Sequence, residues 1–365
     1  MGRRVARGCF GKGIQSMEFF RPSAFAAALF AALCGGSALG AEEASPETAH
    51  PPIGVFGESV HQSGEVKLSY RLHIENQNEL MEGAVQISPS QIQGQYPDGS
   101  VPQAFRSYAH VIELAWKPSD SVTLFVTVPF LEKKLDQTVV STGERYKLAS
   151  RGFGDVIFNG LYRVFADENH RIHLNLGLSL PSGSTNESTE APAGLGPPGQ
   201  EVPAGSLQRL PYIMQLGSGT LSLRPGFTYN GLYRKTFWGA QVLGVLEAGT
   251  NSEGYKAGNV YSFSGWVGRH WKPWLRTSFR AKWKQWFDPT GADDQLDPAL
   301  SPLANTSMQA GQRLDLLFGV DFYVFGGRLK GTRFSIEAGL PTLQELDGPQ
   351  LGTSWLLTAG VQYAF

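Results

Sequence analysis

The sequence predicts an all-β protein, a single transmembrane antiparallel β-barrel of about twelve strands in the outer membrane of a Gram-negative bacterium. Three observations predict it. The chain begins with a secretory signal peptide. Segments of about ten residues then alternate between apolar and polar side chains, and the last of these segments ends on the aromatic residue Phe365. Such strands present one apolar face to lipid and one polar face to the barrel interior.

Residues 1–40 have the composition of a cleaved signal peptide. A basic stretch precedes the apolar run 24–33, and small residues follow up to Gly40. That run is too short for a membrane-spanning helix, which needs about 20 residues. Both cysteines, Cys9 and Cys34, would be removed with it, which excludes disulfides and thiolate metal sites from the mature chain. The remaining 26 basic and 31 acidic residues give a net charge of −5, with no indication of nucleic-acid binding.

The mature chain has no apolar run of helix-spanning length, so a membrane span must be a closed barrel in which every backbone group is paired. Its clearest strand alternates Ile172, Leu174 and Leu176 with His173 and Asn175. Twelve strands are predicted in all, at 65–75, 105–116, 122–130, 154–165, 172–180, 219–230, 236–249, 256–271, 274–287, 311–325, 332–341 and 353–365.

The connections between these strands alternate in length, as they do in outer-membrane barrels. Short turns are predicted near 117–120, 166–169, 231–235, 271–274 and 326–331. Longer loops are predicted near 77–103, 132–151, 182–218, 288–310 and 342–351, with 250–255 exceptionally short. An even strand count places both termini and the short turns in the periplasm, and the long loops outside. Residues 65–365 then form the barrel, and residues 41–64 form an extended periplasmic lead-in or a plug in the barrel mouth.

The polar faces of the predicted strands carry many charges, which would line the lumen. The most distinctive row follows one strand, at Arg276, Arg280, Lys282 and Lys284. Two interpretations remain open: ion pairs fill a narrow interior, or a row of one charge sign guides anions through a polar pore. The candidate lumen and selectivity residues are Lys67, Arg71, Glu113, Arg276, Arg280, Lys282, Lys284, Asp315, Asp321, Arg333 and Glu337.

No catalytic, metal or cofactor site is predicted, and the chain is not expected to be an enzyme. His170 and His173 lie three residues apart, so on one strand they point to opposite faces and cannot hold one metal ion. A serine hydrolase would need a serine and a histidine within hydrogen-bonding distance, and no local pattern brings such a pair together.

Several segments together resemble a known family. They include Gly54-Val55-Phe56-Gly57, Gly152-Phe153-Gly154-Asp155-Val156, the run from His173 to Ser184, and the run from Leu346 to Leu351. This pattern, spread over residues 53–365, is similar to the MetA-pathway of phenol degradation family of outer-membrane proteins. The resemblance implies a barrel and the passage of aromatic or hydrophobic compounds, with no defined binding residues. The chain departs from the family at residues 71–76, which lack a methionine-rich stretch, so no metal-handling role is carried over.

The expected function is a channel or uptake transporter for small molecules. Polar or anionic solutes suit the predicted lumen, whereas aromatic or hydrophobic compounds suit the resemblance. The alternative is a non-conducting structural or surface-interaction barrel with an ion-paired interior, and a barrel-borne hydrolase is the third choice. The expected partners are outer-membrane lipid and lipopolysaccharide, a small-molecule solute, and the barrel-assembly machinery, which would recognise the C-terminal strand ending at Phe365.

Overall fold

The computed structural model describes residues 50–57, 64–197 and 199–364. The predicted signal peptide, most of the predicted lead-in 41–64 and Phe365 lie outside this range. Among the residues described, no helix has the length and apolar character needed to cross a membrane.

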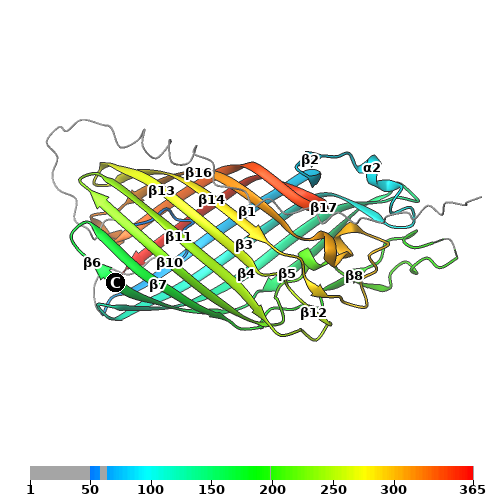
Figure 1. The fold of residues 1–365 in the computed structure, drawn as a ribbon, viewed down its shortest axis with the longest axis horizontal. Helices are drawn as coiled ribbons and strands as arrows, with labels where there is room; N and C mark the ends of the chain where they lie inside the picture. The colour runs from blue at the N-terminus through cyan, green and yellow to red at the C-terminus, as the bar shows by residue number, and fades with distance from the viewer. Residues whose placement is uncertain (1–49, 58–63, 198, 365) are drawn as a thin grey trace, which may run out of the picture. The chain divides into compact units, whose positions relative to one another are not determined.

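Eleven strand elements, each antiparallel to its neighbours, form a closed barrel (Figure 1). Each pairs with the next in chain order, and the last pairs with the first. They are β1 (Val66–Gly83), β3 (Ser100–Ser119), β4 (Val122–Val139), β6 (Ile157–Ala166), β7 (His170–Ser179), β10 (Leu221–Tyr233), β11 (Thr236–Ala248), β13 (Val260–Lys272), β14 (Leu275–Trp286), β16 (Gly311–Tyr323) and β17 (Thr332–Ala364).

The long element β17 crosses the barrel wall twice. Its residues 333–346 run antiparallel to β16, and its residues 346–364 run antiparallel to β1. The two halves also meet each other, because the side chain of Gln344 exchanges two hydrogen bonds with the backbone of Thr353. A ring in which every neighbour is antiparallel needs an even number of passes, and counting β17 twice satisfies this. The predicted all-β antiparallel barrel is confirmed, and each predicted strand range overlaps one of these passes.

Several strands are much longer than predicted. β1, β3 and β4 contain 18, 20 and 18 residues, and β5 (Arg145–Phe153) adds a further strand that pairs with the upper part of β4. The predicted loops 132–151 and 342–351 are therefore largely strand, and that part of the prediction was wrong, whereas the predicted loop 77–103 is strand at both ends and keeps a connection with α2 (Pro89–Gln93) between them. A span needs only about 9–11 residues, so these strands are longer than a span requires. Their additional residues include outward charged side chains such as Glu132 and Lys134, and the apolar signal of a lipid-facing strand is lost there.

The two faces of the wall differ as the alternation predicts. On β7, Leu174 and Leu176 are exposed on the outside, whereas His173 and Asn175 are buried inside. Aromatic side chains lie exposed near the short turns, as expected for residues at a membrane–water boundary. They include Trp116, Tyr162, Trp271 and Trp274.

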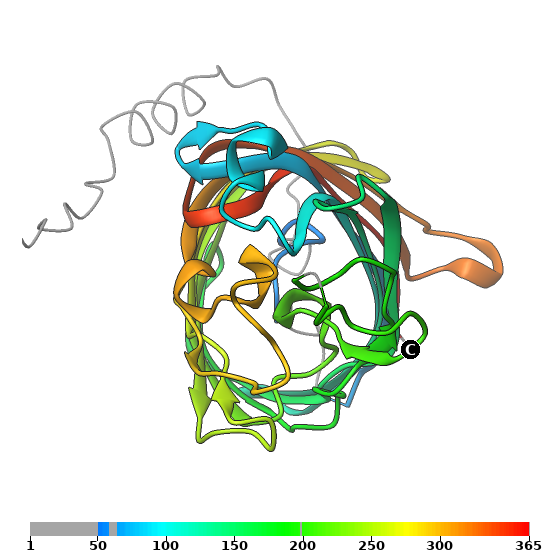
Figure 2. The same cartoon turned by 90° about the vertical axis from the view of Figure 1, so that its right-hand side faces the viewer.

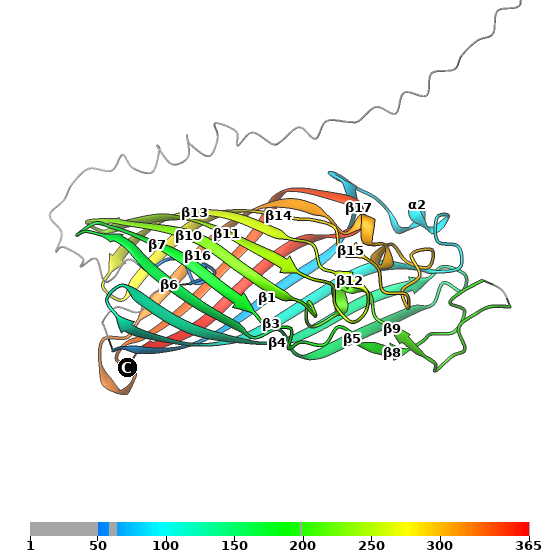
Figure 3. The ribbon, with the colours of Figure 1, turned by 60° about the horizontal axis from the view of Figure 1, so that its bottom comes forward.

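The two ends of the barrel are unequal. Short turns close the turn end, and the long connections gather at the opposite loop end, where Figure 3 places α2 (Pro89–Gln93), β8 (Ser188–Glu190), β9 (Leu207–Arg209), β12 (Tyr255–Lys256) and β15 (Thr290–Gly291). Figure 2 looks at this end and shows several of the connections, among them the gold segment that precedes β16, lying within the outline of the ring, while others lie at its rim. They share a buried apolar cluster with the inner faces of the long strands, to which Ile92, Leu135, Leu210, Met214 and Leu303 contribute.

Candidate functional site: the barrel interior and its loop-end cover

Buried ion pairs fill one side of the lumen. Arg71 on β1 donates two hydrogen bonds of 3.2 Å to Glu113 on β3. Arg280 on β14 binds Glu337 on β17 through two hydrogen bonds of 2.9 and 2.6 Å, reaching across the intervening strand β16. All four side chains are almost completely buried. Burying a charged side chain is costly unless it is paired with an opposite charge and hydrogen-bonded, and both conditions are met here.

Asp321 on β16 is the centre of a second group. One of its oxygens accepts a hydrogen bond of 2.9 Å from Arg276, and the other accepts bonds from Arg333 and from the hydroxyl of Ser335. A third group lies nearer the loop end, where Arg313 contacts Glu75 at 2.6 Å and Asp315 at 2.8 Å. Each of these arginines therefore has a carboxylate partner inside the barrel.

Of the eleven candidate residues, eight take part in these pairs, and the other three are lysines. Lys67 is buried on the inner face of β1, in register with Ala115 and Ala364. Lys282 and Lys284 share the inner face of β14, and within the described part of the chain neither has an ion pair at 4.0 Å or less. The ammonium of Lys284 lies 5.1 Å from the ring centroid of Trp286, a cation–π contact.

The opposite side of the lumen is mainly polar and uncharged. Thr127, Asn159, Asn175, Thr228 and Gln241 are buried on the inner faces of β4, β6, β7, β10 and β11. Gln241 donates a hydrogen bond of 2.9 Å to Thr228, whose hydroxyl lies 3.4 Å from Asn175. The lumen thus has a charged arc and a mainly neutral arc, in which Arg224 of β10 and Glu247 of β11 are exceptions.

Residues 50–57 lie between these two arcs (Figure 2). The carbonyl of Pro51 accepts a hydrogen bond of 2.8 Å from Arg333, and that of Phe56 accepts one of 2.6 Å from Gln241. The Phe56 ring packs against Phe125 at 5.6 Å, and the Arg224 guanidinium lies over it. Because these partners belong to β17, β11, β4 and β10, the segment contacts walls on several sides of the lumen. The sequence alone did not locate these contacts.

Close packing requires glycine at two points of this segment. A Cβ atom at Gly54 would lie 2.3 Å from both Arg280 Nη2 and Glu337 Oε2, so the backbone rests directly on that ion pair. Gly57 has a φ of +73°, a conformation that side-chain-bearing residues rarely adopt. The Gly-Val-Phe-Gly motif therefore permits a backbone to pass through a lumen crowded with side chains.

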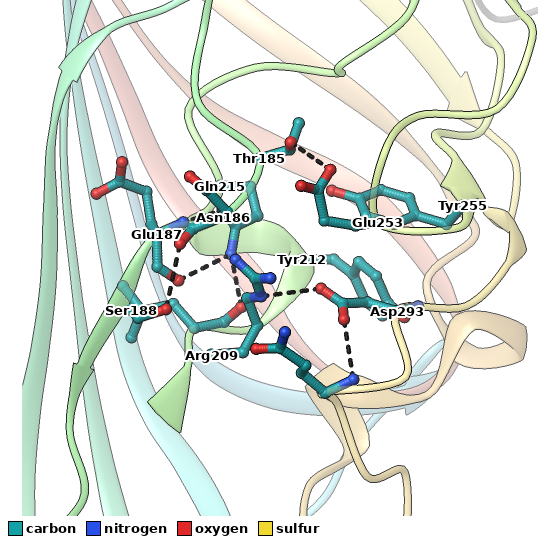
Figure 4. A network of polar contacts seen from close by, with 12 residues as sticks. Thr185, Asn186, Glu187, Ser188, Arg209, Tyr212, Gln215, Glu253, Tyr255 and Asp293 are labelled. Atoms are coloured by element: carbon teal, nitrogen blue, oxygen red, sulfur yellow. Dashed lines mark hydrogen bonds and ion pairs between the residues drawn. The ribbon is translucent and has the colours of Figure 1, made fainter. Parts of the chain in front are cut away.

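A polar network ties three loop-end connections together (Figure 4). Arg209 and Asp293 form a buried ion pair of 3.0 Å, and the Tyr212 hydroxyl accepts a hydrogen bond of 3.0 Å from the Asp293 backbone. Tyr212 packs edge-on against Tyr255, with ring centroids 4.8 Å apart. Burial raises the pKa of Tyr255 to about 12, so it stays neutral near pH 7. We call this network, with the apolar cluster below it, the loop-end cover. It was missed from the sequence because its partners are distant in the chain.

Lys133 connects the cover to the barrel wall. It lies on the part of β4 beyond the lipid-facing residues, and its ammonium donates hydrogen bonds to the carbonyls of Ile213 and Gln215, at 2.9 and 2.5 Å. Burial lowers the pKa of Lys133 to about 8. Gln215 in turn donates to the carbonyl of Leu210 at 2.7 Å, so the connection is fastened both to the wall and to itself.

Histidines do not form a metal site in the residues that the structure covers. The Nδ1 atom of His170 lies at hydrogen-bonding distance, 2.8 Å, from the hydroxyl of Tyr229, whereas the side chain of His173 is buried in the lumen. The two histidines therefore point to opposite faces of β7. Within residues 50–57, 64–197 and 199–364, no three His, Cys, Asp or Glu side chains are placed to hold an ion. The absence of a catalytic site stays a prediction.

A closed antiparallel barrel with an apolar outer wall and a buried polar interior defines the class of outer-membrane β-barrel proteins. Residues 98–338 match the family described as "Putative MetA-pathway of phenol degradation", and the chain belongs to that family. No curated protein matches the sequence.

One solved structure supports the same architecture. An outer membrane channel from Pseudomonas putida F1 matches with a TM-score of 0.56 and 12% identity, over 88% of this chain and 100% of that chain. The KdgM porin matches with a TM-score of 0.38 and 9% identity, over 82% and 99%. The TodX monoaromatic hydrocarbon channel, as a deltaS2 mutant, matches with a TM-score of 0.41 and 8% identity, over 83% and 90%. At 12% identity, the likeness to the Pseudomonas putida F1 channel concerns the fold alone.

Proposed function

We propose that this protein is an outer-membrane channel for small molecules, with the loop end outside, and that it favours compact aromatic or hydrophobic compounds of low charge. The observation that carries the proposal is the state of the lumen: the inward arginines of β1, β14, β16 and β17 are paired with carboxylates, and residues 50–57 occupy the space between its two arcs. Paired charges provide little net field to attract an ion. The family description, which mentions phenol degradation, agrees with this substrate class.

The crowded interior also argues for small solutes. A hydrated ion entering this lumen would lose water of solvation, which is expensive unless charged partners replace it. The arginine side chains are already engaged with their own partners. A neutral aromatic compound loses far less on leaving water, and it can pack against Phe56 and Phe125.

An anion-conducting channel is the second candidate. Lys282 and Lys284 lie side by side on the inner face of β14 without an ion pair at 4.0 Å or less among the described residues. Two such cations would lower the barrier for an anion more than for a cation. The non-conducting structural barrel is the third candidate, favoured by the residues that fill the lumen.

The test compares conductance with solute uptake. Refolded mature protein, checked for a heat-modifiable barrel, is placed in planar bilayers and in liposomes with phenol, benzoate and glucose outside. The proposal expects small conductance and faster entry of phenol than into protein-free liposomes, with glucose excluded. Strong anion preference, reduced by Lys282→Gln with Lys284→Gln, supports the second candidate. Silence in both assays from a folded barrel supports the structural role.

A further inference from the structure

A basic surface lies on the outer wall just beyond the lipid-facing belt. His110, Phe130 and Phe153 are in register across β3, β4 and β5 and form an outward aromatic row, with the Phe130 and Phe153 rings 5.3 Å apart. The Nδ1 atom of His110 lies 2.8 Å from the hydroxyl of Tyr70, so this imidazole is satisfied while facing outward. This row is the edge of the apolar, lipid-facing belt on the side of the loop end, because the next outward residue on β4 in that direction is Glu132.

Charged residues follow toward the loop end. Tyr108, Glu132 and Arg151 are in register one step above the aromatic row, which is about 7 Å along a strand. Arg106 and Lys134 are in register one step higher. We define the basic patch as the five outward cations of these strands, which are Arg106, Lys134, Arg145, Lys147 and Arg151.

The charges of the patch are incompletely balanced. Arg106 and Lys134 are directly opposite each other, and like charges in that position destabilise a strand pair. Lys134 has a partner in Glu132 at 2.7 Å, on the same strand. For Arg145, Lys147 and Arg151, no ion pair within 4.0 Å exists in the described part of the chain, and Asp136 is the remaining acid of this face. The patch keeps a net positive charge that an external anion would neutralise.

Aromatic rings hold two of these cations at the edge of the belt. The Arg151 guanidinium lies 5.7 Å from the centroid of Phe130, and the Lys134 ammonium lies 5.6 Å from that of Tyr108. Cation–π contacts of this kind leave the remaining N–H groups free to donate to an incoming acceptor. The positive charge is therefore located at the level where acyl chains end and head groups begin.

We propose that the basic patch binds the phosphate groups of lipopolysaccharide in the outer leaflet, with the acyl chains lying on the apolar wall below. Arginine donates in a fork that matches phosphate oxygens, and lysine adds a point charge. Exposed apolar side chains on the outside of the same strands, including Ile112, Leu114 and Leu124, provide the surface for the chains. The inference rests on the proposed placement in the outer membrane with the loop end outside, and it is independent of what passes through the lumen.

The test measures lipopolysaccharide bound to the purified, folded full-length mature barrel. Fluorescent lipopolysaccharide is titrated into the parent protein in detergent micelles and into the triple variant Arg106→Gln, Lys134→Gln and Arg151→Gln. We expect at least tenfold weaker binding by the variant, and similar weakening when the parent is offered lipopolysaccharide stripped of its phosphates. Equal binding by the variant, or equal binding of the stripped lipid, would overturn the proposal.

A matched control removes three cations from the turn end instead, through Lys235→Gln, Arg328→Gln and Lys330→Gln. This variant loses the same net charge and is expected to bind like the parent, so weakening in both variants would mean that net charge, not the patch, governs binding. Inorganic phosphate at millimolar concentration is the third arm. Complete displacement of the lipid by it would indicate a free-phosphate site and would also overturn the assignment. Lipopolysaccharide binding and conductance are separate measurements, so a negative result for the basic patch does not count against the channel proposal.

Discussion

Glu337 accepts two hydrogen bonds from Arg280, and both side chains are buried in the lumen. Replacing the carboxylate with an amide in Glu337→Gln would leave the guanidinium buried without a counter-charge, which typically costs about 3–5 kcal/mol. We expect a lower urea midpoint for unfolding in micelles. The released positive charge should also shift the reversal potential in a salt gradient toward anion preference.

Glu132→Gln is the matched control, because Glu132 also pairs with a cation but on the water-facing outer wall. Screening makes an exposed pair weak, and we expect little change in the urea midpoint. If Glu337→Gln unfolds at the same urea concentration as the parent, the Arg280–Glu337 pair does not contribute to the stability of the lumen wall.

At the scale of elements, the loop-end cover depends on the Arg209–Asp293 ion pair, whose side chains are 8% and 2% exposed. Asp293→Asn should loosen the connection 180–220, because Arg209 would keep its charge without a partner. We expect faster proteolytic cleavage within that connection and more frequent open events in single-channel records. The exposed neighbour Asp294 provides the control, Asp294→Asn, which should behave like the parent. If Asp293→Asn is cleaved at the same rate as the parent, the Arg209–Asp293 ion pair does not hold the loop-end cover in place.

Docking of the segment 212–216 on β4 should depend on pH through Lys133. Its pKa is about 8 when docked, against an ordinary value of 10.5, so the undocked state binds more protons between these values. Docking must therefore strengthen as the pH rises from 8 to 10.5, while the neutral amine can still donate to both carbonyls. Hydrogen exchange of 212–216, corrected for its intrinsic pH dependence, should show growing protection over this range. Lys133→Met should abolish the trend, and a trend of opposite sign would contradict the assigned cause.

Strands could be predicted where the pattern that identifies them is contained in a short stretch of sequence. Alternation of apolar and polar residues is local, so the membrane-spanning parts of β7 or β14 could be predicted from a dozen residues. Beyond the membrane both faces of β4 change character, because Glu132 and Lys134 meet water outside while Leu135 is buried inside. The charged lumen face was predictable, but its partners were not. Arg313 meets Glu75 across 238 residues of sequence, and that meeting depends on the closure of the whole barrel.

For the whole molecule, the barrel wall, the cover and residues 50–57 together determine how wide a path remains. We propose that residues 50–57 limit conduction, since their backbone is bound by Arg333 and Gln241 from different sides of the lumen. Deleting residues 50–57 while keeping the signal peptide should increase single-channel conductance severalfold. The charged and neutral arcs of the wall would then face each other across water, and glucose should begin to enter liposomes.

The control deletes residues 199–205, which lie in the largely exposed connection between β8 and β9 and leave the lumen untouched. That variant should conduct like the parent, provided that both barrels show the same heat modifiability. Combining the deletion of 50–57 with Asp293→Asn distinguishes the contribution of the segment 50–57 from that of the loop-end cover. If the segment and the cover act in series, each single change gives a partial gain and the pair gives the largest conductance. If the segment alone limits flow, Asp293→Asn adds nothing to the deletion. No gain from the deletion would place the constriction in the cover or in the side chains of the wall.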